Sequence, residues 1–317
     1  MLYENLAPPR KQTYVFDRTM RVIFFICAIL LIVVMIAVIA LISSNAFLVF
    51  FQGANVKDFF TVSNWDPTGA NDPTGNGHPS FGAAGLILGS VIITLLSVII
   101  ATPLSFGTAL LFTEAAPRWL TRILQPLIEI FTGMPSVVVG FLGLTVLVPF
   151  LKQASAPITG GLPLGGYGLG AATLVLVVMI LPTIISISID TLRAVPGSVR
   201  EASLALGSTR WQMMSKAIIP AASTGLATAV VLGMARAIGE TLAVALVLGG
   251  AQAPKNLFTP AVFFQPNVNI TALIAQDFGE TTGAARNAYW TLAFVLLTIS
   301  FLFICVSRYL ASRSVYK

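Results

Sequence analysis

A short polar stretch between two long apolar runs reads Ser198-Val-Arg-Glu-Ala-Ser-Leu-Ala-Leu-Gly207. Ser198 is a favourable residue for the start of a helix, and Glu201, three positions later, completes the pattern of a capping box. A helix that begins there is expected to run to Leu206, where Gly207 can adopt the left-handed conformation that ends it. The stretch therefore predicts a short, capped helix on a loop outside the apolar runs.

The remainder of this loop predicts a second short helix. Thr209 is a favourable first residue, and Pro220 opens the next apolar run. Trp211, Met213 and Met214 give the second helix an apolar face that nothing else in the chain is expected to cover. From its periodicity, the loop 190–220 is either an amphipathic linker on the membrane surface or a docking surface that fits the groove of a partner.

The composition indicates what surrounds this loop. The chain has 317 residues, of which 56% are hydrophobic and 9% charged, and its mean hydropathy is +0.89. A soluble domain carries about 25% charged residues, so a soluble enzyme, a disordered chain and a disulfide scaffold are excluded. The net charge of +6 does not indicate nucleic-acid binding, because the basic residues are spread over short segments between apolar runs.

Six apolar runs reach the length of about 20 residues that a membrane-spanning helix needs. They are 22–44, 86–112, 127–150, 168–189, 221–250 and 287–307. The runs are continuous and show no two-residue alternation, which favours helices over a β-barrel. Pro103 and Pro135 are expected to kink two of them. The sequence predicts an all-α polytopic membrane protein with six transmembrane helices.

The distribution of Lys and Arg predicts the orientation, because cytoplasmic loops carry an excess of these residues. With the N-terminus inside, thirteen of them lie in inner segments: Arg10, Lys11, Arg18, Arg21, Arg118, Arg122, Arg193, Arg200, Arg210, Lys216, Arg308, Arg313 and Lys317. Four lie in outer segments: Lys57, Lys152, Lys255 and Arg286. Both termini and the loop 190–220 are therefore predicted to be cytoplasmic.

This topology divides the chain into five parts. The predicted parts are a cytoplasmic N-terminal segment 1–21, a first transmembrane helix 22–44, an outer loop 45–85, a core of five transmembrane helices 86–308 and a cytoplasmic tail 309–317. The first helix is longer than the apolar part of a signal peptide, so it is interpreted as an uncleaved anchor.

The residues that carry most cofactor and enzyme chemistry are scarce. Cys27 and Cys305 lie far apart in apolar runs, and His78 is the single histidine, so a metal or haem site is not predicted. No lysine follows a glycine, so the core of a phosphate-binding Walker A loop is absent from this sequence. No nucleophile and base stand close together. ATP and Mg²⁺, if used, are expected to bind to another polypeptide, and the chain is not expected to be an enzyme.

Arg236 and Glu240 are two ionisable residues inside the fifth apolar run. They are four positions apart, so a continuous helix would place them on one face. Arg236 is expected about 22 Å from the inner end of this helix, near the middle of the membrane. The residues can form a buried ion pair that holds two helices together, or they can line a pathway for a charged substrate. An anion is the natural substrate for an arginine.

Two weaker candidates lie in the third run. Gly133-Met134-Pro135-Ser136 is expected to kink or break this span. At a restarted helix, Ser136 can offer a hydroxyl or an amide to an anion, although a plain kink explains the stretch as well. Glu129 is interpreted as a first-turn carboxylate that the helix dipole favours.

The loop resembles the E-A-A…G…L-P loop of ABC importer permeases. The matching residues are Glu201-Ala202-Ser203, Gly207 and Ile219-Pro220, with Ser203, Ala217 and Ile219 as mild departures. The resemblance implies a type I ABC importer permease of MetI-like fold, in which the loop carries the coupling helix that docks on a separate ATPase. The residues implied at this contact are Glu201, Ala202, Ser203, Gly207 and Arg210.

Other segments resemble the phosphate-specific, PstC-type branch of these permeases. They are Phe59-Phe60 with Trp65-Asp66-Pro67, Phe81-Gly82 with Pro103-Leu104-Ser105 and Glu114, Gly133 to Phe141, and Ala235 to Thr241. The resemblance implies a phosphate importer of the bacterial inner membrane with a PstA-type permease, a PstB-type ATPase and a PstS-type binding protein as partners. It also implies that Arg236 and Glu240, within the motif that ends at Thr241, take part in phosphate passage.

Two alternatives to phosphate import stay open at this point. The first is an ABC importer permease for another oxyanion, because the substrate follows from resemblance alone. The second is an ion-coupled secondary carrier, which needs coupling residues in several spans and leaves the loop 190–220 without a purpose. A membrane-embedded enzyme is disfavoured because no catalytic set is present.

Overall fold

The computed structural model describes residues 11–70, 77–155, 164–250, 252–253 and 259–312. Within these ranges the N-terminal part contains α1 (Lys11–Ala46), α2 (Leu48–Phe51), α3 (Val56–Thr61), β1 (Trp65–Asp66), β2 (Ser80–Phe81), α4 (Ala84–Leu110), η1 (Leu111–Ala115) and α5 (Arg118–Gly133). The middle part contains α6 (Ser136–Leu142), η2 (Gly143–Leu147), α7 (Val148–Ser155), α8 (Leu169–Arg193), α9 (Gly197–Ala205), α10 (Arg210–Met213), η3 (Met214–Ile218) and α11 (Ile219–Ala221). The C-terminal part contains α12 (Ser223–Gly239), α13 (Leu242–Leu248), η4 (Pro260–Phe263), α14 (Ile270–Asp277) and α15 (Gly283–Ser312).

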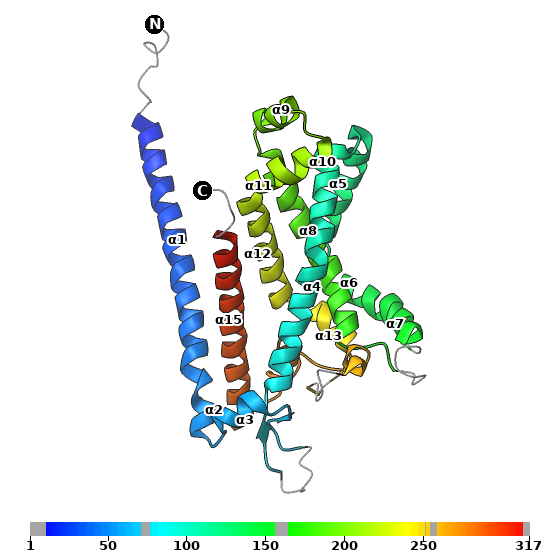
Figure 1. Cartoon of the computed structure of the whole chain (residues 1–317). Helices are drawn as coiled ribbons and strands as arrows, with labels where there is room; N and C mark the ends of the chain where they lie inside the picture. Colours follow the sequence, from blue (N-terminus) through cyan, green and yellow to red (C-terminus); the bar gives the residue numbers. More distant parts are fainter. Residues whose placement is uncertain (1–10, 71–76, 156–163, 251, 254–258, 313–317) are drawn as a thin grey trace.

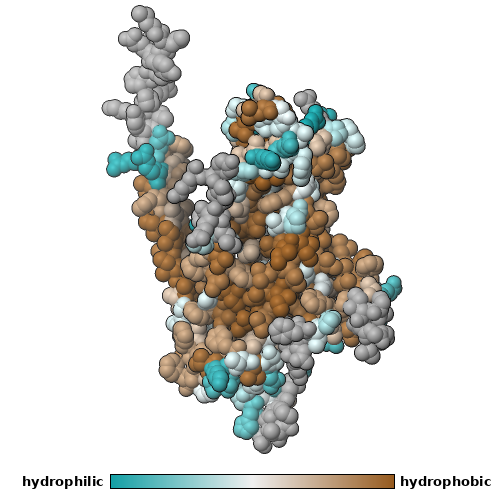
Figure 2. Space-filling model, in the orientation of Figure 1, coloured by the Kyte–Doolittle hydropathy of each residue, from teal (hydrophilic) through white to brown (hydrophobic). Residues whose placement is uncertain are grey.

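The long helices stand side by side and form one apolar band. Among the residues that the structure describes, five helical stretches are long and apolar enough to cross a membrane, and a bent pair of helices makes a sixth. Figure 2 shows hydrophobic residues in a broad belt, with hydrophilic residues gathered at the two ends. The prediction of an all-helical polytopic protein with six spans is confirmed.

The N-terminal end of α1 and the C-terminal end of α15 lie at the same end of the molecule as α9 (Figure 1). The segment between α1 and α4, with α2, α3 and the two short strands, lies at the opposite end. This arrangement agrees with both termini and the loop 190–220 on one side of the membrane. We refer to these as the α9 end and the outer end.

The third span starts later than predicted. A transmembrane helix over 127–150 was expected, but the apolar stretch runs from Ser136 to Ser155. The preceding residues form the separate helix α5, which ends at Gly133, and Pro135 is the N-cap of α6. Pro135 therefore breaks the chain here, because proline removes a backbone donor and clashes with the preceding turn of a helix.

The fifth span is bent once and interrupted once. The helices α10–α11 and α12 meet at an angle of 71° next to Ala222. Further along, α12 ends at Gly239 and α13 begins at Leu242, so the predicted run 221–250 is not one helix. Figure 1 shows α12 ending about half-way between α9 and the outer end. The span is thus discontinuous near the middle of the membrane.

The centre of the bundle is the contact of α8 with α4 and α12. Leu176 and Ile180 of α8 are 2% and 0% exposed and belong to the main apolar core. Gly233 of α12 packs so closely on α8 that an added Cβ would lie 2.5 Å from the Ile184 Cγ1 atom. A small residue at this point lets the two helices approach. Because α12 rests directly on α8, a displacement of α8 acts on α12.

Helix α1 lies apart from this core. None of the residues in its most apolar 18-residue stretch is buried, and Figure 1 shows the helix beside α15 only. Its outer end is fixed to α15, where Thr291 Oγ1 donates a hydrogen bond of 2.6 Å to the Ala46 carbonyl. The five remaining spans therefore form the compact part of the chain.

The outer loop folds into a small structure that packs against the outer end of α15. Strands β1 and β2 pair antiparallel, with Trp65 opposite Phe81. Phe59 is fully buried, and the rings of Phe59 and Tyr289 both pack edge-on against Trp65, with centroids 6.2 and 5.6 Å away. These aromatic contacts hold the loop against the start of α15.

Three π-helical turns interrupt the helices of the described chain: η1 after α4, η2 between α6 and α7, and η3 between α10 and α11. A π turn holds an extra residue and is found often at functional sites. η1 carries Glu114, and η3 follows the second helix of the loop 190–220.

Candidate coupling loop and translocation site

The helix α9 begins one residue before the predicted N-cap. Its first residue is Gly197, and its N-cap is Pro196, which makes no side-chain capping bond. The expected capping box of Ser198 and Glu201 is therefore wrong. Proline suits this place because it fixes φ near −65°, and its carbonyl oxygen accepts a bond of 3.1 Å from the Val199 amide. The predicted short helix itself is present and ends at Ala205.

The turn after α9 has the predicted conformation. Gly207 has a φ of +79°, in the left-handed region that favours glycine. Ser208 Oγ donates a bond of 2.7 Å to the Ser203 carbonyl and lies 2.8 Å from Ser203 Oγ, which closes the turn. Thr209 then caps α10 through a complete capping box with Gln212. We call residues 197–213, which hold α9, this turn and α10, the elbow.

The elbow exposes some of its apolar residues and buries others. Leu206 is 89% exposed and Trp211 is 66% exposed. Met213 is 6% exposed and packs in a core with Leu192 and Ile218, so the expectation that nothing in the chain covers Met213 is wrong. Leu206 and Trp211 are therefore the most exposed large apolar side chains of the elbow, ahead of Leu204, which is 46% exposed.

The polar residues predicted at the ATPase contact lie on the same elbow. Glu201, Ala202 and Arg210 are exposed, and Ser203 is half-buried in the bonds that close the turn. An added Cβ on Gly207 would meet no atom within 4 Å. The elbow thus presents a small exposed surface with a charge of each sign beside two apolar side chains.

An ion pair that the sequence analysis did not identify holds α9 in place. Arg200 Nη2 and Nε lie 2.9 and 3.1 Å from one carboxylate oxygen of Glu114. The same guanidinium donates to the carbonyls of Leu192 and Val195 at 2.9 and 2.7 Å. The partners are 86 positions apart in the chain, so helical spacing gives no sign of their contact.

Arg236 lies near the end of α12, where the fifth span is interrupted. Its Nη1 atom donates a hydrogen bond of 3.0 Å to Thr183 Oγ1 of α8. Both residues are half-buried. Nothing in the sequence marks Thr183, which follows Pro182 in an apolar helix and has no motif around it. The contact fixes one edge of the guanidinium to the central helix of the bundle.

Glu240 does not pair with Arg236. Its backbone is extended, with φ −74° and ψ 128°, so the two residues do not share one helix face as expected. Both residues belong to the part of the chain that the structure describes, and no ion pair joins them there. The carbonyl oxygen of Glu240 accepts a bond of 3.1 Å from Thr271 Oγ1 in the first turn of α14. The interruption is therefore stabilised by a residue 31 positions further along the chain.

Ser136 and Thr241 lie at the starts of two helices that pack side by side. Gly140 of α6 lies against Ala243 of α13, where an added Cβ would be 2.6 Å from the Ala243 Cα atom. One turn later, Gly143 lies against Val247, so α6 and α13 run in the same direction. Both helices therefore begin at a similar depth, and helix N-termini favour anions. Ser136 and Thr241 are half-buried.

Glu129 has a different position from the predicted one. It lies in the last part of α5, not in a first turn, and it is exposed. Gln125 Nε2 donates a bond of 3.3 Å to its Oε1 atom. An interaction with the N-terminus of a helix therefore does not account for this residue.

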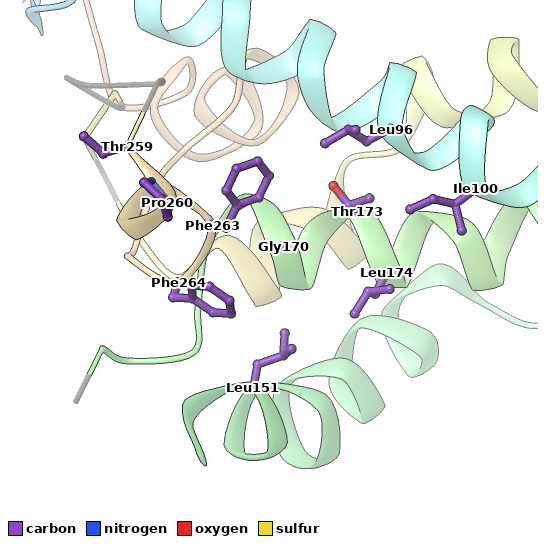
Figure 3. A pocket seen from close by; sticks show the side chains of 10 residues that line it. All are labelled: Leu96, Ile100, Leu151, Gly170, Thr173, Leu174, Thr259, Pro260, Phe263 and Phe264. Carbon is purple, nitrogen blue, oxygen red and sulfur yellow. The ribbon is translucent and has the colours of Figure 1, made fainter. Parts of the chain in front are cut away.

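An apolar pocket of about 530 Å³ lies between α4, α7, α8 and η4. Figure 3 shows Leu96, Ile100, Leu174 and Phe263 pointing into it. Its walls are mostly hydrocarbon and carry no charged side chain. The cavity therefore offers little to an anion, and the interruption near Arg236 is the better candidate for a pathway.

Sequence comparisons place these features in a known group. Residues 101–316 match the family described as "Binding-protein-dependent transport system inner membrane component". A probable ABC transporter permease, YqgH of Bacillus subtilis (strain 168), is 42% identical over 98% of this chain and 96% of its own length. The phosphate transport system permease PstC of Pasteurella multocida is 34% identical over 80% and 79% of the two chains. PstC of Xylella fastidiosa (strain 9a5c) is 36% identical over 80% and 78%.

Solved structures of ABC importers share the fold. A bacterial alginate ABC transporter in complex with its pentasaccharide-bound periplasmic protein matches with a TM-score of 0.60 and 14% identity, covering 93% of this chain and 96% of the other. An inward-facing structure of the MetNI methionine transporter matches with a TM-score of 0.56 and 19% identity, covering 73% and 95%. At these identities the likeness shows the fold, which is the predicted MetI-like fold.

The six apolar spans, the exposed elbow and these similarities agree with one another. The chain is a multi-pass protein of the bacterial inner membrane and a transport subunit, and as the permease of an importer it works with an ATPase and a binding protein. It belongs to the family of binding-protein-dependent transport system inner membrane components.

Proposed function

We propose that the chain is the permease subunit of an ATP-driven phosphate importer and forms half of its translocation pathway. The proposal extends the family membership to a substrate and to specific partners. The substrate is supported by relatives that are named as phosphate transport permeases and cover about 80% of this chain.

The observation that carries the proposal is the setting of Arg236. An arginine has five N–H donors in a planar fork that matches an oxyanion, and the hydrogen bond to Thr183 uses Nη1. Glu240 does not neutralise the guanidinium as a paired carboxylate would. A half-buried, unneutralised arginine at an interrupted span can contact an anion in passage, since an ionisable residue inside a membrane generally serves a pathway.

The starts of α6 and α13 support the same site. Ser136 and Thr241 can offer hydroxyl groups, and the helix N-termini behind them carry partial positive charge. Glu240 lies beside this region and lowers the net positive potential. A weakly binding site suits a pathway, because the anion must leave as well as enter.

The partners follow from the same proposal. A PstA-type permease supplies the other half of the pathway, and a PstS-type protein delivers phosphate at the outer end. A PstB-type ATPase binds ATP and Mg²⁺ and contacts the elbow, with Glu201, Ala202, Ser203, Gly207 and Arg210 as the residues proposed at this contact. The exposure of Leu206 and Trp211 supports the elbow as a docking surface.

The test is reconstitution of the four proteins in liposomes that contain ATP. Radiolabelled phosphate supplied outside with the binding protein is expected to accumulate inside, and labelled sulfate is not. Accumulation of sulfate instead of phosphate would show an importer for another oxyanion. Uptake of phosphate by this chain alone, driven by an ion gradient without ATP, would show a secondary carrier and contradict the proposal.

A further inference from the structure

We infer that Arg200 is a positioning residue that connects the elbow to two membrane spans, so that movement of α9 is passed to both of them. The inference rests on the proposed docking of the ATPase on the elbow. It adds a route by which a displacement at the docking surface reaches the pathway.

The contacts of the Arg200 guanidinium join three separate elements. Nε and Nη2 lie 3.1 and 2.9 Å from Glu114 Oε1 in the π turn that continues α4. Nη2 also donates to the Leu192 carbonyl at 2.9 Å, and Nη1 donates to the Val195 carbonyl at 2.7 Å, at the end of α8. One side chain of α9 is therefore bonded to the inner ends of both α4 and α8.

These contacts are partly shielded from water. The Glu114 side chain is 9% exposed and that of Arg200 is 24% exposed. Screening by solvent is weaker for such a pair than for an exposed one. A guanidinium can serve a carboxylate and two carbonyls at once because its donors lie in a fixed plane, whereas the ammonium group of lysine has no such fork.

The remainder of α9 is weakly attached to the chain. None of its residues is buried, and Val199 within α9 is only partly buried against the core that contains Leu192. The elbow is thus an exposed lever that is bonded through Arg200 to the spans. Without these bonds, a push on Leu206 or Trp211 can move α9 alone.

The span α8 continues the route to the proposed pathway. Its inner end accepts the bond from Arg200 at Leu192, and nine positions earlier Thr183 accepts the bond from Arg236. The two bonds are about 13 Å apart along one helix, at 1.5 Å per residue. A displacement of α8 therefore changes the position of the residue that orients Arg236.

The inference is tested in the complete complex by measuring phosphate uptake and ATP hydrolysis in the same liposomes. Arg200→Met, Glu114→Gln and the double variant are compared with wild type. Arg193→Met, an exposed arginine in the same region, serves as the matched control. The number of phosphate ions moved per ATP is expected to fall about tenfold in Arg200→Met, which corresponds to about 1.4 kcal/mol of lost coupling. The amount of assembled complex and the Arg193→Met value are expected to stay near wild type.

Two further comparisons separate positioning from stability. The double variant is expected to lose no more coupling than Arg200→Met, since both changes remove one connection. Arg200→Lys is expected to lie between wild type and Arg200→Met. A proportional fall in uptake and hydrolysis, at an unchanged ratio, would overturn the inference, and so would losses that multiply in the double variant.

The inference can still be decided if Arg200→Met does not assemble or if the wild-type complex does not transport phosphate. If Arg200→Met fails to assemble, Glu114→Gln alone decides, because it is isosteric and keeps the bonds from Arg200 to the carbonyls. If the wild-type complex moves no phosphate, the proposed substrate fails. The inference is then decided by the stimulation of ATP hydrolysis by the binding protein, which is expected to be lost in Arg200→Met and kept in Arg193→Met.

Discussion

Arg236 of α12 donates a hydrogen bond of 3.0 Å to Thr183 of α8, next to the close approach of these two helices at Gly233. The bond leaves the remaining donors of the guanidinium to be directed elsewhere, and it ties their orientation to α8. The contact therefore decides how an anion meets Arg236, and four experiments follow from this site and from the elbow.

Replacement of Thr183 by valine is expected to weaken phosphate uptake without loss of the protein. The change keeps the size of the side chain and removes the acceptor of the Arg236 bond. A hydrogen bond to a charged group contributes about 1.5–3 kcal/mol, so the phosphate concentration for half-maximal uptake is expected to rise about tenfold. Thr183→Ser keeps the hydroxyl and is expected to remain near wild type. Equal uptake by the valine and serine variants would contradict a positioning role for Thr183.

Replacement of Arg236 by glutamine is expected to abolish phosphate uptake while the complex still assembles. Glutamine keeps polar groups at the interruption but removes the charge that attracts an anion. Uptake and the yield of the purified four-protein complex are measured together. Arg308→Gln changes an exposed arginine near the end of α15 and is the matched control. Normal uptake by a well-expressed Arg236→Gln variant would refute the pathway role.

Replacement of Gly207 by arginine is expected to prevent docking of the ATPase. A non-glycine residue at a φ of +79° costs about 1–2 kcal/mol, and asparagine tolerates this region better than most. The Cβ position is open within the chain, so a large side chain clashes only with a partner. Gly207→Asn is expected to co-purify with the ATPase and Gly207→Arg is not. ATPase recovery at the wild-type level with Gly207→Arg would count against docking at the elbow.

The predicted orientation is checked by labelling single cysteines with a reagent that does not cross the membrane. The background carries Cys27→Ser and Cys305→Ser. Lys57→Cys in α3 is expected to react in intact cells, because α3 lies at the outer end, whereas Ser198→Cys in α9 is expected to react only after the membrane is opened. Labelling of Ser198→Cys in intact cells would reverse the topology and remove the basis for an ATPase contact.

The spans could be predicted because hydrophobic length and the Lys and Arg bias depend on local composition. The left-handed turn at Gly207 could be predicted because it needs a glycine and little else. The start of the third span was placed too early, since α5 carries enough apolar residues, such as Leu127 and Ile130, to extend the run. The break at Pro135 itself was foreseen.

The details of both sites depended on contacts that sequence spacing does not show. Arg236 and Glu240 were expected to share one helix face because the fifth span reads as one helix, and no proline marks the interruption. Thr271, which bonds to the Glu240 carbonyl, lies on a distant segment. The same holds for Arg200 and Glu114, which were noted only as a basic residue of an inner loop and as part of a family motif. Burial of Met213 depends on packing with Leu192 and Ile218 in the same way.

The π turn η1 determines the direction in which the Glu114 side chain leaves the helix. A π turn accommodates one residue more than an α turn, so removal of a residue there leaves a regular α-helix instead of a gap. All side chains beyond that point then rotate by about 100° around the axis, the angle between successive residues. Deletion of Leu111 is therefore expected to keep α4 helical and to move Glu114 out of reach of Arg200. Circular dichroism reports whether the helix is kept. A charge-reversal rescue, in which the charges of the two residues are exchanged, reports whether they still meet. The extra residue of η1 would then set the angle around the helix axis at which Glu114 meets Arg200, and so the position of α9 relative to the span α4.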